Sequence, residues 1–87
     1  MQRSTKLLDA MLNVIVVDPA KVIFEGQAQS VILPGEMGVF EILPFHKDLL
    51  SRLVGGKLII DGHFVSIRRG IVKVASNIVT AIVEEAE

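Results

Sequence analysis

Short apolar runs separated by turn signals cover most of the chain. In residues 12–17, Leu12, Val14 and Val16 occupy every second position, and a proline follows the run directly. Further strand-like stretches fall at residues 22–24, at 27–33 after a Glu-Gly turn signal, and at 39–43; the second is polar at its start and apolar at its end. A period of two, broken about every 8 to 12 residues, predicts β-strands.

The second half of the chain contains the clearest strand pattern. Asp61-Gly62 is a favoured two-residue turn because both residues tolerate positive φ, so the residues from 57 to 69 predict a β-hairpin around it. Gly70 predicts a bend or bulge, and residues 71–75 and 78–83 predict two more strands.

Two segments depart from this pattern. In residues 46–54, Leu49, Leu50 and Leu53 share one side of a helical wheel, which predicts one or two turns of helix with these leucines in the core. Residues 1–11 are more polar and predict an N-terminal extension or a short helix. Residues 12–87 are therefore predicted to form an all-β domain: a small β-sandwich or flattened barrel of about ten short strands with Greek-key-like or meander connections.

The chain carries more apolar residues than a small domain can bury. Its 87 residues are 51% hydrophobic with a mean hydropathy of +0.55, and residues 78–83 are apolar on both faces, whereas a sheet with one face in water should alternate. Either this strand is sandwiched centrally or a partner protein covers its second face. The overall apolar excess favours the partner.

Composition excludes several classes of protein. The chain has no cysteine, which excludes disulfides and the common zinc fingers. A net charge of -1 provides no field for nucleic acid or an anionic bilayer. No apolar run approaches the roughly 20 residues that span a bilayer, and no signal peptide is recognisable, so a cytoplasmic location without bilayer insertion is expected. Arg68 and Arg69 lie in a predicted strand, where they should point to opposite faces and form no joint basic patch.

Catalytic and metal-binding residue types occur without a matching arrangement. His46, Asp48 and Ser51 supply the types of a hydrolytic triad, but triad members converge from separate elements, and Asp48 fits the start of the predicted helix. His46 and His63 could share a metal with Asp61 or Glu41, yet their spacing matches no known motif. The interpretation is a non-catalytic protein without cofactor or metal.

One segment resembles a known family. Residues 31–50 read VILPGEMGVFEILPFHKDLL, which is similar to the most recognisable segment of epsilon subunits of rotary F-type ATP synthases. The flanking turns and strands agree with that family over residues 12–84. The resemblance implies its N-terminal β-sandwich, a mechanical part of the central stalk that couples rotation of the gamma subunit to the membrane c-ring during ATP synthesis and hydrogen ion transport, at the cytoplasmic face of the membrane.

Positions carried over from the family suggest contact residues. The resemblance implies that a loop of five residues faces the polar loops of the c-ring, and that His46 and Ser51 lie near gamma. The loop residues are Glu36, Met37, Gly38, Val39 and Phe40. The family's loop glutamate falls at Val39, so Glu36 or Glu41 must supply any acidic contact.

The sequence also departs from the family. Phe45 stands where the family has a glycine, Lys47-Asp48 replaces Ala-Pro, and Glu41 takes a position where glycine is common. The family's C-terminal helical hairpin, which the resemblance associates with ATP sensing and inhibition of hydrolysis, would begin where this sequence stops. Neither of these two functions is therefore expected of the given sequence. Two other classes remain open: a β-sandwich adaptor that binds a partner protein or peptide along an exposed edge strand, and a small enzyme or ligand carrier, which needs a concave pocket.

Overall fold

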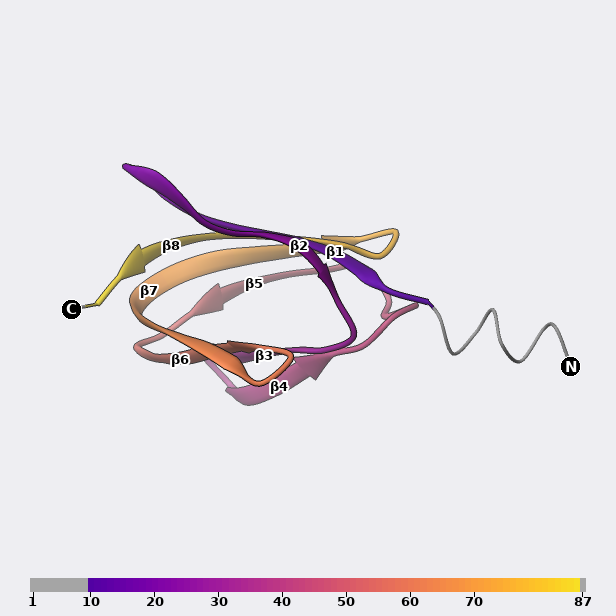
Figure 1. The fold of residues 1–87 in the computed structure, drawn as a ribbon. Coiled ribbons are helices and arrows are strands. Elements are labelled where there is room, and N and C mark those ends of the chain that lie inside the picture. Colours follow the sequence, from indigo (N-terminus) through magenta and orange to yellow (C-terminus); the bar gives the residue numbers. More distant parts are fainter. Residues whose placement is uncertain (1–9, 87) are drawn as a thin grey trace, which may run out of the picture.

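The computed structural model describes residues 10–86, so the predicted extension at residues 1–11 lies almost entirely outside the described residues. This described part contains eight strands, which confirms the all-β prediction with fewer strands than expected (Figure 1). In chain order they are β1 (Leu12–Asp18), β2 (Lys21–Ala28), β3 (Val31–Gly35), β4 (Gly38–Ile42), β5 (Leu49–Leu53), β6 (Gly56–Ile60), β7 (His63–Ala75) and β8 (Ile78–Glu85). Residues 10–86 include no helix that is long and apolar enough to cross a membrane.

The strands form two layers that face each other across the core (Figure 1). The first layer has the order β2-β1-β8-β7-β5, with β1 and β8 parallel. In the second layer β4 pairs with β3, β3 with β6, and β6 with the first half of β7. Strand β7 belongs to both layers, and a single residue pair, Gly35 with Leu53, joins β3 to β5. The result is the predicted sandwich, close to a flattened barrel.

Alternating side chains of the strands fill the space between the layers. In β1 and β8 every second residue is buried, as the period of two predicts. The core consists of Leu12, Val14, Val16, Ala28, Val31, Leu33, Ile42, Leu53, Leu58, Ile60, Ile67, Val72, Val74, Val79, Ala81 and Val83. Because this core is apolar throughout, shape and area of contact hold the layers together.

Strand β7 crosses from one layer to the other without a break in its pairing. Its register against β8 shifts between Ile67 and Arg69, so the predicted irregularity is present but lies about two residues before Gly70, which pairs regularly with Val83. A bulge increases the twist of a strand and bends it. The bend lets one strand of 13 residues serve both layers.

Two local predictions were wrong. Residues 49–53 form strand β5 and not a helix, because their main chain pairs with residues 70–74 of β7, and a helix this short is unstable alone. The predicted turn at Glu25-Gly26 lies within β2, where both residues pair with β1. The chain turns instead at residues 29–30.

Asp61 links the β6–β7 turn of the second layer to the connection that runs from β2 to β3. It takes a φ of 47° in the β6–β7 turn, and its carboxylate accepts hydrogen bonds from the main-chain N–H of Gln29 and Ser30 at 3.0 to 3.1 Å. Replacing Asp61 by alanine should lower the free energy of unfolding by about 1 to 2 kcal/mol, since it removes these bonds and strains the turn. Asp61→Asn should cost less, because asparagine tolerates positive φ and keeps one acceptor. Urea denaturation of both variants checks this, and equal stability of Asp61→Ala and the unmodified chain would contradict it.

Candidate functional site

The β3–β4 turn is the most exposed part of the segment that resembles the family. Met37 is fully exposed and Val39 is 74% exposed, while Gly38 has a φ of 123° that favours glycine. A Cβ on Gly35 would lie 2.6 Å from the Phe40 ring, so this ring packs directly on the hairpin backbone. Of the five predicted c-ring residues, Glu36 to Val39 are exposed and Phe40 packs against the core.

His46 and Ser51 lie away from this turn. His46 follows β4 at its opposite end, and its Nδ1 is 2.7 Å from the carbonyl oxygen of Lys47. Ser51 is half-buried on the inward side of β5, and its hydroxyl donates to the carbonyl oxygen of Arg52 at 3.1 Å. The structure therefore does not bring the two predicted contact sets together, and a proposed contact from β5 is better made by the outward Leu50.

The residue types of a triad or metal site make local contacts. The hydrogen bonds described for His46 and Ser51 go to neighbouring main-chain oxygens, with no bond between the two side chains. Asp48 starts no helix, since residues 46–48 are irregular and lead into a strand. Among residues 10–86, no three His, Cys, Asp or Glu side chains gather closely enough to hold a metal ion.

An apolar patch covers the outward face of the first layer. We call Leu50, Ile71 and Ile82 the outer patch; they are 72%, 48% and 55% exposed. Ile71 pairs with Ile82 across β7 and β8; Leu50 of β5 pairs with Lys73, two residues along from the pair Arg52–Ile71, and so lies diagonally to Ile71. Within residues 10–86 no second layer covers this face, so in the described part of the chain residues 78–83 are not sandwiched centrally. The both-faces apolar pattern of β8 was the sequence signal for this patch, although no residue of it was predicted as a contact.

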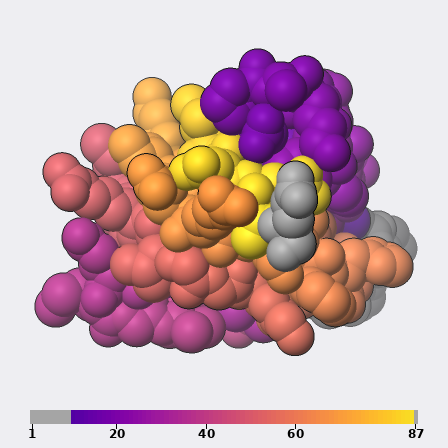
Figure 2. Space-filling model, turned by 90° about the vertical axis from the view of Figure 1, so that its left-hand side faces the viewer, coloured from indigo at the N-terminus to yellow at the C-terminus, as the bar shows by residue number. Residues whose placement is uncertain are grey.

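A hollow of about 850 Å³ adjoins the outer patch at one end of the sandwich. Figure 2 views this end, where the β1–β2 turn overhangs the end of β8. The lining residues are Asp18, Pro19, Glu36, Arg52, Leu53, Arg69, Gly70, Ile71, Ile82, Val83 and Glu84. Since Glu36 belongs to the β3–β4 turn and Ile71 to the outer patch, the hollow connects the two surfaces.

Arg68 and Arg69 both contact the carboxylate of Glu84, which corrects the prediction that their side chains point to opposite faces and form no joint basic patch. Arg69 Nε lies 3.1 Å and Arg68 Nη1 4.0 Å from the carboxylate of Glu84. The register shift between Ile67 and Arg69 disturbs the strict alternation of the strand and brings both guanidinium groups to one side. Because all three side chains are largely exposed, we assign these pairs little stability.

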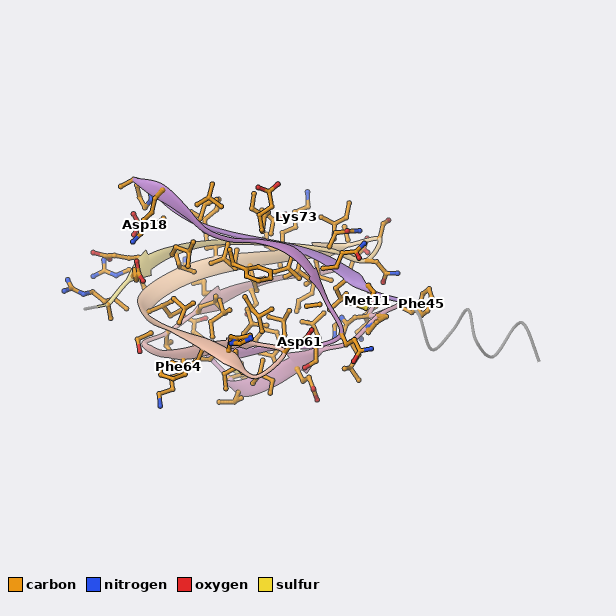
Figure 3. All side chains as sticks on the ribbon, viewed as in Figure 1. Met11, Asp18, Phe45, Asp61, Phe64 and Lys73 are labelled. Atoms are coloured by element: carbon orange, nitrogen blue, oxygen red, sulfur yellow. The ribbon has the colours of Figure 1, made fainter. Side chains whose placement is uncertain are left out.

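Asp18 fastens the β1–β2 turn to the end of β8 (Figure 3). Its oxygens accept hydrogen bonds from the main-chain N–H of Ala20 and of Glu85 at 2.9 and 3.2 Å. The hydrogen bond from Ala20 lowers the pKa of Asp18 most, followed by the bond from Glu85. Together with the charge of Lys21 they hold this pKa below its ordinary value of 3.8.

This lowered pKa predicts an acid-sensitive part of the stability. The folded state favours the charged carboxylate, so the contribution is present above pH 3.8 and is lost as the pH falls through the lower folded pKa. The urea concentration at the unfolding midpoint of the unmodified chain should therefore decrease as the pH is lowered from 3.8 through the folded pKa of Asp18. Asp18→Asn should remove that part of the dependence, and an unchanged pH profile of the variant would contradict the assignment.

Sequence comparisons identify related proteins. Residues 11–87 match the family described as ATP synthase, Delta/Epsilon chain, beta-sandwich domain. The chain is 42% identical over 80 residues to an ATP synthase epsilon chain of a Nitratiruptor species, covering 86% of this chain and 62% of the relative. It is 34% identical over 77 residues to an ATP synthase epsilon chain of Leptospira borgpetersenii serovar Hardjo-bovis, covering 84% and 61%. The chain thus spans under two thirds of these relatives.

Solved structures share the fold. A chain of the Euglena gracilis mitochondrial ATP synthase, determined as OSCP/F1/c-ring, superposes with a TM-score of 0.80 at 18% identity over 90% of this chain and 53% of that one. A chain of the Tetrahymena thermophila mitochondrial ATP synthase central stalk/c-ring has a TM-score of 0.72 at 15% identity over 85% and 63%. Together with the match over residues 11–87, the two-layer fold shows that the chain belongs to the ATP synthase delta/epsilon family, as its β-sandwich domain.

Proposed function

We propose that this chain is a non-catalytic central-stalk subunit of a rotary F-type ATP synthase, which couples rotation of the gamma subunit to the c-ring in ATP synthesis and ion transport. The observation that carries the proposal is the family match over residues 11–87. A dense β-sandwich suits a part that transmits torque, because a close-packed core deforms little under load. The chain works from the cytoplasmic face, as a peripheral part of the membrane complex.

The outer patch is the surface we assign to gamma. It supplies adjacent exposed aliphatic side chains on a paired and therefore stiff part of the sheet. Arg52 pairs with Ile71, and Lys73 pairs with Leu50, so cationic side chains border the patch. An apolar centre with a polar rim is the usual composition of a specific protein interface. His46 and Ser51 stay predicted gamma contacts, although Ser51 lies on the inward side of β5 and the outer patch on the outward side.

The β3–β4 turn is the surface we assign to the polar loops of the c-ring. Glu36 supplies a carboxylate and Met37 an adaptable side chain that is fully exposed. Phe40 packs against Gly35 and holds the hairpin, so a load applied at the turn passes directly into the core. The hollow beside Glu36 lies between this surface and the outer patch.

Binding to the gamma subunit of the same source tests the proposal. Calorimetry and native mass spectrometry of the purified proteins should detect a one-to-one complex, which Leu50→Glu is expected to weaken because Leu50 is the exposed outer-patch side chain of β5. Failure of two folded proteins to bind would remove the coupling role. The peptide adaptor would then take its place, because β2 and β4 lie at the two ends of the described sheet, where edge strands can accept an added strand.

A further inference from the structure

Phe45 occupies a backbone conformation that its side chain disfavours. The main-chain N–H of His46 donates to the carbonyl oxygen of Leu43 at 3.1 Å, which closes a four-residue turn. Pro44 holds the second position and Phe45 the third, with a φ of 68°. This combination has the pattern of a type II turn, whose third position favours glycine, and a bulky residue there is a genuine outlier.

The surrounding structure maintains this conformation. The main-chain N–H of Phe45 donates to Oδ1 of Asn77 in the β7–β8 turn at 2.6 Å. Asn77 itself has a φ of 63°, and its carbonyl oxygen accepts from the N–H of Asn13 at the start of β1. These bonds involve only the main chain of Phe45, so a glycine would keep them.

The phenyl ring contributes little to the core. Phe45 is 67% exposed and Leu43 beside it is 50% exposed. In Figure 3 the Phe45 label lies at the end of the sandwich opposite Asp18. Neither the turn nor the packing of residues 10–86 therefore explains an aromatic residue here, and unexplained strain in an exposed aromatic points to use by a partner.

We propose that Phe45 is an anchor residue for the gamma subunit and inserts into an apolar recess on it; this rests on the proposed function. Phe45 directly precedes His46, which is itself a predicted gamma contact. The c-ring does not fit as the partner, since the β3–β4 turn lies at the other end of β4, roughly 17 Å away for a five-residue strand. Gamma must then contact the connection between β4 and β5 as well as the outer patch.

The variant Phe45→Gly separates this role from a structural one. It relieves the strained turn while removing the ring, so the urea midpoint should stay equal or rise, whereas the affinity for gamma measured by calorimetry should fall about tenfold or more. Phe64→Ala is the matched control: Phe64 is 58% exposed on the second layer, with Lys57 Nζ 4.5 Å above its ring, and its loss should leave the affinity unchanged.

Each outcome decides the assignment. A large loss of affinity with retained stability supports Phe45 as an anchor. Equal binding by Phe45→Gly and the unmodified chain overturns the anchor alone, and the proposed function survives. A lower stability of the variant shows a structural role and also overturns it. If the unmodified chain itself does not bind gamma, both the anchor and the proposed function are lost.

Discussion

Ile82→Glu is expected to weaken binding to the gamma subunit by about a hundredfold. Ile82 lies at the β8 end of the outer patch, paired with Ile71 of the patch on one side and with Val17 of β1 on the other. A carboxylate buried there against an apolar partner surface would lose its hydration without gaining a partner, which costs about 3 kcal/mol or more. Because Ile82 is 55% exposed in the free chain, the fold should tolerate the change.

Val39→Glu is the matched control for this experiment. Val39 is a β-branched residue with 74% exposure on the second layer, and it belongs to the surface assigned to the c-ring. Calorimetry should therefore find an unchanged affinity for gamma in this variant, and thermal unfolding should show that both variants are folded. Equal binding by folded Ile82→Glu and the unmodified chain would show that gamma does not use the outer patch.

Gly70→Ala is expected to lower the free energy of unfolding by about 3 kcal/mol, or the melting temperature by roughly 15 °C for a domain of this size. An added Cβ would lie 2.7 Å from the carbonyl oxygen of Ile82 and 3.1 Å from the Cα of Val83. Both atoms belong to the main chain of β8, which pairs with β7 at this point. The clash can be relieved only by separating the strands.

A second glycine provides the control for Gly70. At Gly55 an added Cβ would lie 3.4 Å from the carbonyl oxygen of Arg68, an ordinary contact, so Gly55→Ala should change the stability little. Urea denaturation of the two variants measures the difference. Similar stabilities would mean that β7 and β8 can shift apart at low cost, contrary to the close approach in the structure.

Local patterns predicted the strands well where one face is buried. The alternation in residues 12–17 and the Asp61-Gly62 turn both involve residues close in sequence, and both were confirmed. The same reasoning failed for β5. Leu49, Leu50 and Leu53 fit a helical face, but only Leu53 is fully buried and Leu50 is 72% exposed.

The candidate contact surfaces were predicted less completely than the fold. The resemblance located the β3–β4 turn, which is exposed, and His46, which lies near the strained Phe45. The outer patch was missed, because its residues come from β5, β7 and β8 and become neighbours only through pairing across the sheet. The apolar excess and the two apolar faces of residues 78–83 indicated such a surface on β8, but not its partners on β5 and β7.

The sequence alone determined the all-β class, several turns and the family, because period-two alternation and turn chemistry act between neighbouring residues. The tertiary structure decided the rest. Pairing with β7 made residues 49–53 a strand, the parallel contact of β1 with β8 joined residues more than 60 positions apart, and the layering decided which apolar side chains stay exposed. These outcomes depend on contacts distant in sequence, whose free energy overrides the weak local preference of a short segment.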